Sequence, residues 1–418
     1  MKESIKKRIE AVRRGEVPEG YKRTDSGVMP EEWPNSTIGK IIAFHSEKST
    51  INNQYPVLTS ARSGLALQTE YFEDQVTREE NAGYNVIPRG YVTYRSRSDD
   101  GRFTFNQNQI VEKGIVSCFY PVFRIIEDLA DPTFVLSYLN NYLGRQIVKE
   151  IVGTSQLVLS EKKLSALRLP CPPLAEQKKI SEILATCDRV IELKRQLLEE
   201  KRRQKKWLMQ KLLDPNAGVN QPECSGVKWI TRCIKELGTV ITGSTPDKSC
   251  DEFWGGDFPW ITSQDFTGKY IGIAEVHVTD AGKKKCRVLP AGAVLVTCIA
   301  SIGLNAIAKV ECATNQQINA VICNGICSEE MLYYIIEYNR GTLERIAGKT
   351  AVPIISKDQF EKIKVTIPES RSEQDKITKV LSAADSEIQL LQNELEIWQQ
   401  KKKALMQLLL TGLVRVNA

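Results

Sequence analysis

The feature that most constrains the fold is a charged helical segment that occurs twice. Residues 176–213 and 373–410 align without a gap at an offset of 197, and 17 of the 38 aligned residues are identical. Identities at charged and polar positions, such as Gln177 with Gln374, argue against two unrelated amphipathic surface helices. Forty helical residues extend about 60 Å. A chain of 418 residues that repeats such a helix is expected to consist of two related halves.

Apolar residues in both copies recur in steps of four and three, which is the heptad pattern of a coiled coil. A proline precedes each copy, as is common where a helix begins. We therefore predict helices at 174–213 and 373–411 that pair antiparallel. The first copy is interrupted by Lys194, Lys201 and Lys205, whose aliphatic stems can cover apolar surface. The predicted interface residues are Ile180, Leu184, Ile191, Leu198, Ile377, Leu381, Ile388, Leu391, Leu395, Trp398 and Leu405.

The regions before the two helices repeat more weakly. "YPVLTS" (55–60) aligns with "FPWITS" (258–263), and "IPRGYV" (87–92) aligns with "LPAGAV" (289–294). Their β-branched and aromatic residues between Gly and Pro favour strands, whereas 134–148 and 331–346 are expected to be helical.

We therefore predict an α+β fold: two tandem mixed α/β domains, separated by two long helices that pair as an antiparallel coiled coil, with an internal pseudo-twofold duplication. The expected boundaries are a helical N-terminal segment (1–25), a first domain (26–170), a first long helix (171–215), a second domain (216–367), and a second long helix with a tail (368–418).

Composition and motifs argue against several classes of chemistry. Eleven scattered cysteines and two histidines do not have the spacing of a metal site, and they suggest reduced thiols in a cytoplasmic protein. The N-terminus lacks the apolar core of a signal peptide, and no apolar run is long enough for a membrane span. Dinucleotide, zinc-protease and serine-hydrolase motifs are missing from the sequence. We expect no catalytic residue and no bound metal.

The remaining candidates are polar and basic loops suited to nucleic acid. "YRSRSDDGRFTFNQNQ" (94–109) mixes aromatic, arginine and amide side chains. Arginine can read guanine, amides can read adenine, and basic residues neutralise phosphates, although such loops are also common on ordinary solvated surfaces. The candidate DNA-binding residues of the first domain are His45, Lys48, Thr59, Ser60, Arg62, Tyr94, Arg95, Arg97 and Arg102. Those of the second domain are Ser244, Thr245, Lys248, Thr262, Ser263, Gln264, Asp265, Ser301 and Asn305.

The order of these blocks resembles the specificity subunit of Type I restriction–modification enzymes over essentially the whole chain. The matching blocks are "VPEGYKRTDSGVMPEEWP" (17–34), "WGGDFPWITSQDF" (254–266), "ASIGLNAI" (300–307), "TNQQINAVI" (314–322), the two helix starts and "LLLTGLVRV" (408–416). The first domain departs from the family pattern, because "YPVLTSARSG" (55–64) stands where a tryptophan-containing block is expected. This departure suggests that the two domains read different sequences.

The resemblance implies a non-catalytic subunit that binds double-stranded DNA with a bipartite target, one domain per half-site. It also implies docking of two modification (adenine methyltransferase) subunits and of restriction subunits. S-adenosylmethionine, ATP and Mg would be bound by those partners and not by this chain.

Two other hypotheses compete with this one. A single-chain modification enzyme or nuclease would need a methyl-donor loop or nuclease carboxylates, which the sequence does not display. A coiled-coil scaffold whose domains bind protein partners explains the helices but not the arginine–aromatic loop. Salt-dependent binding to DNA would separate the scaffold from the specificity subunit.

Overall fold

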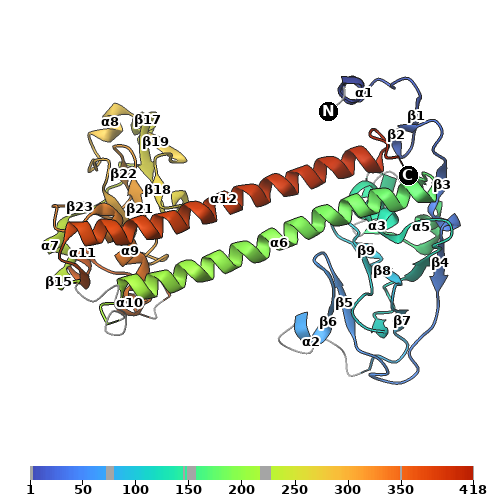
Figure 1. Ribbon diagram of the computed structural model, residues 1–418, viewed down its shortest axis with the longest axis horizontal. Helices are drawn as coiled ribbons and strands as arrows, with labels where there is room; N and C mark the ends of the chain where they lie inside the picture. The colour runs from blue at the N-terminus through green and yellow to red at the C-terminus, as the bar shows by residue number, and fades with distance from the viewer. Residues whose placement is uncertain are drawn as a thin grey trace. The chain divides into compact units, whose positions relative to one another are not determined.

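A computed structural model describes residues 3–71, 80–144, 146–147, 157–216, 227–348 and 351–417. Its contacts divide the chain into two compact units, Met1–Lys194 with Leu395–Ala418, and Arg195–Glu394. Each unit contains one mixed domain and a part of each of two long helices, α6 (Leu174–Leu213) and α12 (Arg371–Leu410) (Figure 1). No described helix is long and apolar enough to cross a membrane.

The domain of unit 1 is built from short strands with a few helices. Its elements are α1 (Glu3–Arg13), β1 (Tyr21–Thr24), β2 (Gly27–Pro30), β3 (Asn35–Thr37), η1 (Ile38–Lys40), β4 (Ile42–His45), β5 (Leu58–Ala61), β6 (Gly64–Leu67), α2 (Gln68–Tyr71), β7 (Asn85–Pro88), β8 (Val92–Tyr94), β9 (Arg97–Ser98), β10 (Phe105–Gln107), β11 (Lys113–Val116), β12 (Val122–Ile125), α3 (Pro132–Tyr142), β13 (Leu157–Val158), α5 (Glu161–Ala166) and β14 (Arg168–Pro170).

The domain of unit 2 has a similar succession of elements. They are β15 (Trp229–Cys233), α7 (Ile234–Leu237), β16 (Gly238–Thr242), η3 (Asp251–Phe253), β17 (Trp254–Ile261), η4 (Ser263–Asp265), β18 (Tyr270–Ile271), β19 (Val276–Val278), α8 (Asp280–Lys283), β20 (Val294–Thr297), β21 (Asn305–Ala308), β22 (Ala313–Thr314), β23 (Ile318–Cys323), α9 (Glu329–Tyr338), α10 (Arg340–Ala347), α11 (Lys357–Glu361) and β24 (Lys364–Pro368).

The main sheets of the two domains have the same topology. In unit 1 the strand order is β4-β12-β8-β10, with antiparallel neighbours throughout. In unit 2 the order is β16-β23-β20-β21, also antiparallel, with the short strand β18 added parallel to β21. Each domain also pairs its last strand with an earlier one, β14 with β3 in unit 1 and β24 with β15 in unit 2. The predicted internal duplication is therefore present in the sheets as well as in the helices.

Two of the predicted strand segments are each interrupted by a turn. The segments 87–92 and 289–294 each contain a glycine in the left-handed region, Gly90 at φ 83° and Gly292 at φ 87°. That conformation cannot continue a strand and is available to glycine at little cost. The chain turns there and then enters the central strands β8 and β20.

The predicted domain helices also differ in detail. The expected helix at 331–346 is interrupted at Asn339, whose backbone (φ −89°, ψ 8°) ends α9 and precedes α10. In the first domain, α3 begins one residue after Asp131, whose side chain accepts a hydrogen bond from the Phe134 N–H as an N-cap. Ser328 has the same role for α9, accepting from the Met331 N–H.

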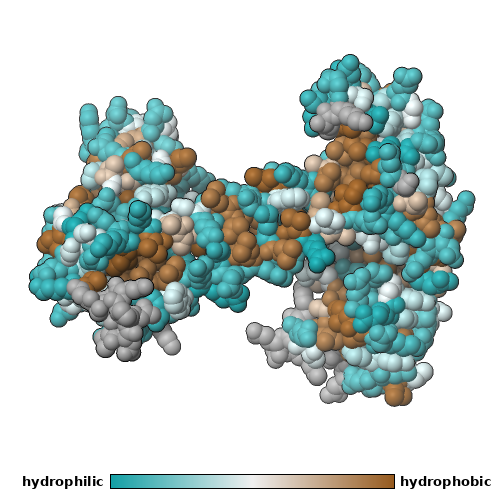
Figure 2. Space-filling view, viewed as in Figure 1, coloured by the Kyte–Doolittle hydropathy of each residue, from teal (hydrophilic) through white to brown (hydrophobic). Residues whose placement is uncertain are grey.

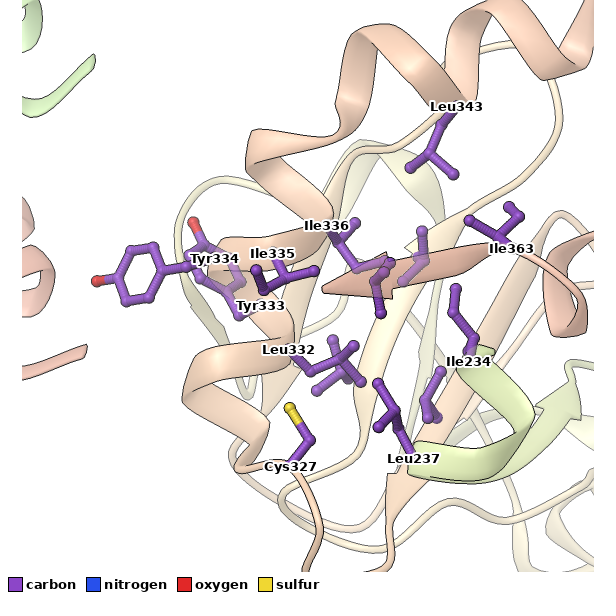
Figure 3. Close-up of a cluster of buried hydrophobic side chains, with 14 of the residues drawn as sticks. Ile234, Leu237, Cys327, Leu332, Tyr333, Tyr334, Ile335, Ile336, Leu343 and Ile363 are labelled. Carbon is purple, nitrogen blue, oxygen red and sulfur yellow. The ribbon is translucent and has the colours of Figure 1, made fainter. Parts of the chain in front are cut away.

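Each domain packs its helix on one face of its sheet. In unit 2, Leu332 and Ile336 of α9 join Ile234 and Leu237 in a buried cluster. Figure 3 shows these side chains pointing toward one another, while the hydroxyl groups of the two adjacent tyrosines on α9 point away from the cluster. In unit 1, α3 contributes Phe134 and Tyr138 to the corresponding core.

The two long helices pair antiparallel within each unit. In unit 1, Lys402 of α12 donates to Asp188 of α6 at 2.5 Å. In unit 2, Lys201 and Lys205 of α6 lie 2.7 Å from Glu387 and 2.8 Å from Asp385 of α12. Residue numbers fall along one helix as they rise along the other, which confirms the predicted antiparallel coiled coil.

The predicted interface residues fall into two groups by exposure. Ile180, Leu184, Ile191, Leu198, Ile377 and Leu381 are buried. Ile388, Leu391, Leu395, Trp398 and Leu405 are partly buried.

The apolar interface between the two long helices, which we call the seam, also contacts the domains at its ends. Ile180 and Leu184 share one hydrophobic cluster with α3 and with Leu409. Ile377 and Leu381 share another cluster with α9. The apolar positions of the repeated helix therefore serve two purposes: they pair the helices and they anchor a domain.

A repeated glutamine makes the same connection in both units. Gln177 Oε1 accepts a hydrogen bond from the backbone N–H of Asp131 at 2.9 Å. Gln374 Oε1 accepts one from the backbone N–H of Ser328 at 3.0 Å. Each amide also donates to the carbonyl of a proline that precedes its own helix, at 2.8 Å and 2.9 Å. These identical residues thus attach each long helix to the N-cap of the domain helix beside it.

Candidate nucleic-acid interface

In unit 1, a hollow of about 680 Å³ lies at the edge of the sheet where β8 ends and β10 begins. Residues 59–63, from β5 and the turn after it, and the loop 95–104 form much of its lining. Six of the predicted residues line it together: Thr59, Ser60, Arg62, Arg95, Arg97 and Arg102. The structure therefore brings together two segments that the sequence places more than thirty residues apart.

The loop that carries three of these arginines is held by its own hydrogen bonds. Asp100 Oδ1 accepts from the Ser98 hydroxyl at 3.0 Å and from the Arg102 N–H at 3.2 Å. Gly101 has φ 75°, a conformation that residues with a Cβ rarely adopt. On the other side of the loop, Ser98 pairs with Leu157 in the β9–β13 ladder. The backbone of the loop is therefore held by local structure.

Two of the arginines are engaged by neighbouring side chains. Arg62 Nη2 donates to Asp100 Oδ2 at 2.5 Å, which links the β5 hairpin to the loop. The guanidinium of Arg97 lies 5.0 Å from the centre of the exposed Phe119 ring. The Arg102 N–H, then the Ser98 hydroxyl and Arg62, lower the pKa of Asp100 to about 2. This carboxylate is therefore charged throughout the physiological range.

A second connection closes the side of the hollow next to the sheet. Asn106 Nδ2 of β10 donates to the Ser60 hydroxyl and to the Ala61 carbonyl, both at 2.8 Å. The β5 hairpin is thus attached to the main sheet by an amide and to the loop by an ion pair. The hollow is formed by elements that hold one another in place.

The prediction that Tyr94 of the first domain contacts DNA is wrong. The side chain of Tyr94 is completely buried, packs 5.0 Å from the Phe105 ring, and donates its hydroxyl to the Leu159 carbonyl. Because side chains alternate across a strand, Tyr94 at the end of β8 points into the core while Arg95 is exposed. Tyr94 supports the hollow from behind and has no surface for a ligand.

His45 ends β4 and Lys48 follows it at the same edge of the sheet, but neither residue lines the hollow. The His45 ring lies edge-on to Tyr91, 5.1 Å between centres, and its Nε2 is 3.3 Å from Glu47 Oε2. Lys48 Nζ donates to Asn85 Oδ1 at 2.5 Å. Both side chains have local partners, so a role in binding DNA stays a prediction for them.

In unit 2, the sheet topology gathers the predicted loops at the corresponding edge. Strands β16 and β20 end there, and their antiparallel neighbours β23 and β21 begin there. The parallel strands β17 and β22 end beside them, because Asn315 N–H bonds to the Ile261 carbonyl and Ser244 N–H bonds to the Thr314 carbonyl. We call the exposed and half-exposed residues 244–245, 262–264, 301 and 315–317 at this place the polar edge.

Most of the predicted second-domain residues lie on this edge. Thr245 Oγ1 donates to Gln316 Oε1 at 2.5 Å, and Ser244 Oγ accepts from the Arg287 N–H at 2.8 Å. Ser263, Gln264 and Ser301 are at least partly exposed.

Lys248 is exposed in the loop that follows β16. Asn305 begins β21, and its Oδ1 is buried without a hydrogen-bond partner among the residues that the structure describes.

Asp265 has a structural role that the sequence did not indicate. Its Oδ2 accepts from both the N–H and the hydroxyl of Thr262, at 2.7 and 2.9 Å, and its Oδ1 accepts from the Glu275 N–H at 2.9 Å. These contacts form a capping box around η4. Asp265 and Thr262 therefore shape the loop, and the neighbouring exposed Gln264 is the better candidate for contact with a ligand.

Sequence reasoning missed Gln316 on the polar edge and Arg287 beside it. Arg287 Nη1 donates to the Thr242 carbonyl at 2.9 Å, so its exposed guanidinium caps the end of β16. Gln316 is held by Thr245. Arg287 follows a run of three lysines that resembles an ordinary solvated surface, and only the pairing of β16 shows where it lies.

The described residues contain no group of three or more His, Cys, Asp or Glu side chains arranged to hold a metal ion. The Cys323 and Cys327 thiols are largely buried, and burial raises the pKa of Cys323 to about 12. The chemistry that both edges offer is therefore hydrogen bonding and charge, from arginine, amide and hydroxyl groups.

The comparisons with known proteins agree with this arrangement. The family model described as "Type I restriction modification DNA specificity domain" matches twice, at residues 30–201 and 226–397. These two matches together cover more than half of the chain, and each ends within a long helix.

Full-length similarity extends to named relatives. The chain is 24% identical to the putative type I restriction enzyme MjaX specificity subunit of Methanocaldococcus jannaschii, over 96% of this chain and 97% of that protein. It is 35% identical to the MjaIX specificity subunit of the same organism over 40% of each chain.

A solved structure gives the same fold. The S subunit of a Type I restriction–modification system from M. genitalium aligns with a TM-score of 0.56 at 15% identity, covering 90% of this chain and 96% of that chain. The two family matches, together with the duplicated sheets and the paired helices, show that the chain belongs to the family of Type I restriction–modification specificity subunits.

Proposed function

We propose that this chain recognises a two-part target in double-stranded DNA, with one half-site against the hollow of the first domain and the other against the polar edge of the second. The observation that carries the proposal is that equivalent edges of two duplicated sheets both present exposed hydrogen-bonding side chains. Side chains of this kind read base edges in the major groove, while basic groups position the phosphates.

The long helices are proposed to set the spacing between the half-sites. Forty residues without a break correspond to about 60 Å of helix. In each unit, the helices are attached to the domain by a buried glutamine and by apolar residues of the seam. Because each domain is fixed to the helices in this way, the length of the helices would determine where its DNA-contacting edge lies.

The same helices offer a surface for partner subunits. Figure 2 shows apolar side chains, in brown, at the surface along the long helices. Exposed apolar residues of this kind include Leu193 at 57% and Ile397 at 47% in unit 1, and Leu390 at 64% and Trp207 at 53% in unit 2. Exposed apolar groups on a helix suit protein contacts. We propose that modification subunits, two per chain, dock on the helices and that restriction subunits add to that complex.

Catalysis is proposed to belong to these partners. Adenine methylation with S-adenosylmethionine, and ATP- and Mg-dependent translocation and cleavage, would be carried out there, while this chain supplies only recognition and assembly.

The test is a selection of bound duplexes from a fully random 30-base-pair pool by the purified full chain at about 150 mM salt. The proposal predicts two enriched blocks separated by a fixed number of unselected positions. Arg95→Ala and Gln264→Ala serve as matched variants, and each should weaken a different block. Enrichment of a single continuous block, or salt-dependent binding without any enrichment, would contradict the proposal. Failure to bind DNA at low salt would favour a scaffold that binds proteins.

A further inference from the structure

The hollow of the first domain contains both signs of charge. Four arginines line it, together with Asp99 and Asp100. A site for the DNA backbone is expected to be uniformly basic, because carboxylates repel phosphate groups at short range. The two aspartates therefore favour an uncharged partner, such as the edge of a base pair, over a phosphate.

The four arginines are not equivalent. Arg62 is paired with Asp100, and Arg97 lies over the Phe119 ring. Arg95 and Arg102 are exposed, and their guanidinium groups make no hydrogen bond or ion pair with another residue in the part of the chain that the structure describes. These two side chains keep their full set of donors for a ligand.

The chemistry of a free guanidinium selects one base. Guanine presents two acceptors, N7 and O6, on its major-groove edge, and an arginine fork can donate to both. Adenine presents an acceptor beside a donor, which opposes a second guanidinium donor. Building on the proposed function, we propose that the hollow reads a G·C pair, with Arg95 or Arg102 donating to guanine N7 and O6, and with Asp100 acting as a positioning residue through Arg62 and the loop.

This preference belongs to the first half-site only. The repeat alignment places Thr297 and Ile299 of the second domain opposite Arg95 and Arg97. Thr297 is buried, and its hydroxyl donates to the carbonyl of Ser301, with the carbonyl of Leu304 at 3.2 Å. The same position of the fold thus carries a base-reading cation in one domain and an internal hydrogen bond in the other.

The experiment compares Arg95→Lys, Arg102→Lys and the control Arg89→Lys in the full chain. Lysine keeps the positive charge but loses the fork. Arg89 is an exposed arginine of the same unit that bonds to Glu112 outside the hollow. Each variant is first used to select duplexes from the random pool. Each is then tested by titration against the duplex that the wild-type chain selects, with 7-deazaguanine, which lacks the N7 acceptor, replacing one guanine at a time.

The expected result is an invariant G·C pair in one selected block. Deaza substitution of that guanine should weaken wild-type binding about 5- to 150-fold. The same deaza substitution should have little further effect on the lysine variant, Arg95→Lys or Arg102→Lys, that has already lost the contact. The control Arg89→Lys should behave as wild type. The other selected block should be unchanged.

Two results would overturn the inference. One is a first block without any invariant G·C pair. The other is an equal loss on all duplexes for both lysine variants, which would indicate phosphate contacts. Both results leave two enriched blocks in place and so spare the proposed function, whereas the loss of all enrichment would contradict the proposed function itself.

Discussion

The two domains share a scaffold and differ at the edge that we propose to face DNA. The main sheets have the same strand order, and identical glutamines attach a long helix to the N-cap of a domain helix in each unit. At the equivalent edges, however, the first domain presents arginines around a hollow and the second presents amides and hydroxyls. Duplication has thus preserved the parts that position an edge, while the side chains on that edge have changed independently.

The units also differ in how they hold the long helices. In unit 1, the Glu176 carboxylate is buried and accepts from Arg415 at 2.7 and 2.8 Å and from the Trp33 indole at 3.3 Å. Its repeat partner Glu373 is partly exposed and lies 2.7 Å from Lys376 within the same helix. The same repeated residue therefore makes a tertiary contact in the first copy and a local contact in the second.

The largest expected effect tests this difference. Glu176→Ala should destabilise unit 1 by about 3 kcal/mol, because it leaves the buried Trp33 N–H unpaired and removes the main partner of Arg415. Glu373→Ala should cost below about 0.5 kcal/mol, as expected for an exposed pair on one helix. Hydrogen–deuterium exchange of peptides from each unit measures both. Equal losses of protection would show that the two glutamates are equivalent after all.

The next prediction concerns the pH dependence of the stability of unit 2. Lys269, whose side chain is 9% exposed, pairs with Glu330 and donates to Ser382 of α12 at 2.7 Å. Burial raises the pKa of Glu330, but hydrogen bonds from Lys269 and Tyr270 outweigh it and leave that pKa below its ordinary value. Stability from this group is therefore present above pH of about 4.5 and is lost as the pH falls through the lowered value.

Glu330→Gln should cost about 2 kcal/mol at pH 7, because Lys269 loses its charged partner. It should also flatten the acid dependence of unit 2 while leaving that of unit 1 unchanged. Urea denaturation between pH 3 and pH 7, followed by exchange of unit 2 peptides, gives the measurement. An acid dependence that persists in the variant would assign it to another carboxylate.

The shared glutamines should have equal effects. Gln177 and Gln374 are both buried, and each satisfies an N-cap N–H and a proline carbonyl. Replacing either with alanine should destabilise its own unit by about 1–2 kcal/mol. Peptide-level hydrogen–deuterium exchange compares the two variants directly. A difference of more than about 1 kcal/mol between their losses of stability would mean that only one of the two glutamines stabilises its unit appreciably.

The smallest expected effect separates two neighbours on the polar edge. Gln264→Ala should reduce discrimination at the second half-site by about 1 kcal/mol without changing stability, because the side chain is exposed. Asp265→Ala should instead destabilise the loop, because its carboxylate accepts three local hydrogen bonds. Binding to duplexes altered in one half-site, measured beside thermal unfolding, distinguishes these outcomes.

Much of the fold could be predicted because the repeat is recorded in identities and in apolar spacing. The long helices and their antiparallel pairing follow from positions such as Leu184 and Leu381, which hold in both copies. The sequence does not reveal the turns at Gly90 and Gly292, because the apolar residues on either side of them continue the strand pattern.

The site was predicted in outline and missed in detail for a physical reason. Composition locates a loop such as 94–102, but it does not determine which side of a strand end a residue occupies, so buried Tyr94 and exposed Arg95 looked alike. Arg287 is placed by a side-chain hydrogen bond to a carbonyl 45 residues away, which no local sequence pattern records.

The most direct test of the account is to lengthen both helices together. One heptad inserted after Gln196 in α6 and one after Glu394 in α12 keep the seam in phase and add about 10.5 Å. Selection from the random pool should then return the same two blocks, with the gap between them longer by about three base pairs, given a rise of about 3.4 Å for each. Unchanged blocks with an unchanged gap would show that the paired helices do not set the spacing and would contradict the account.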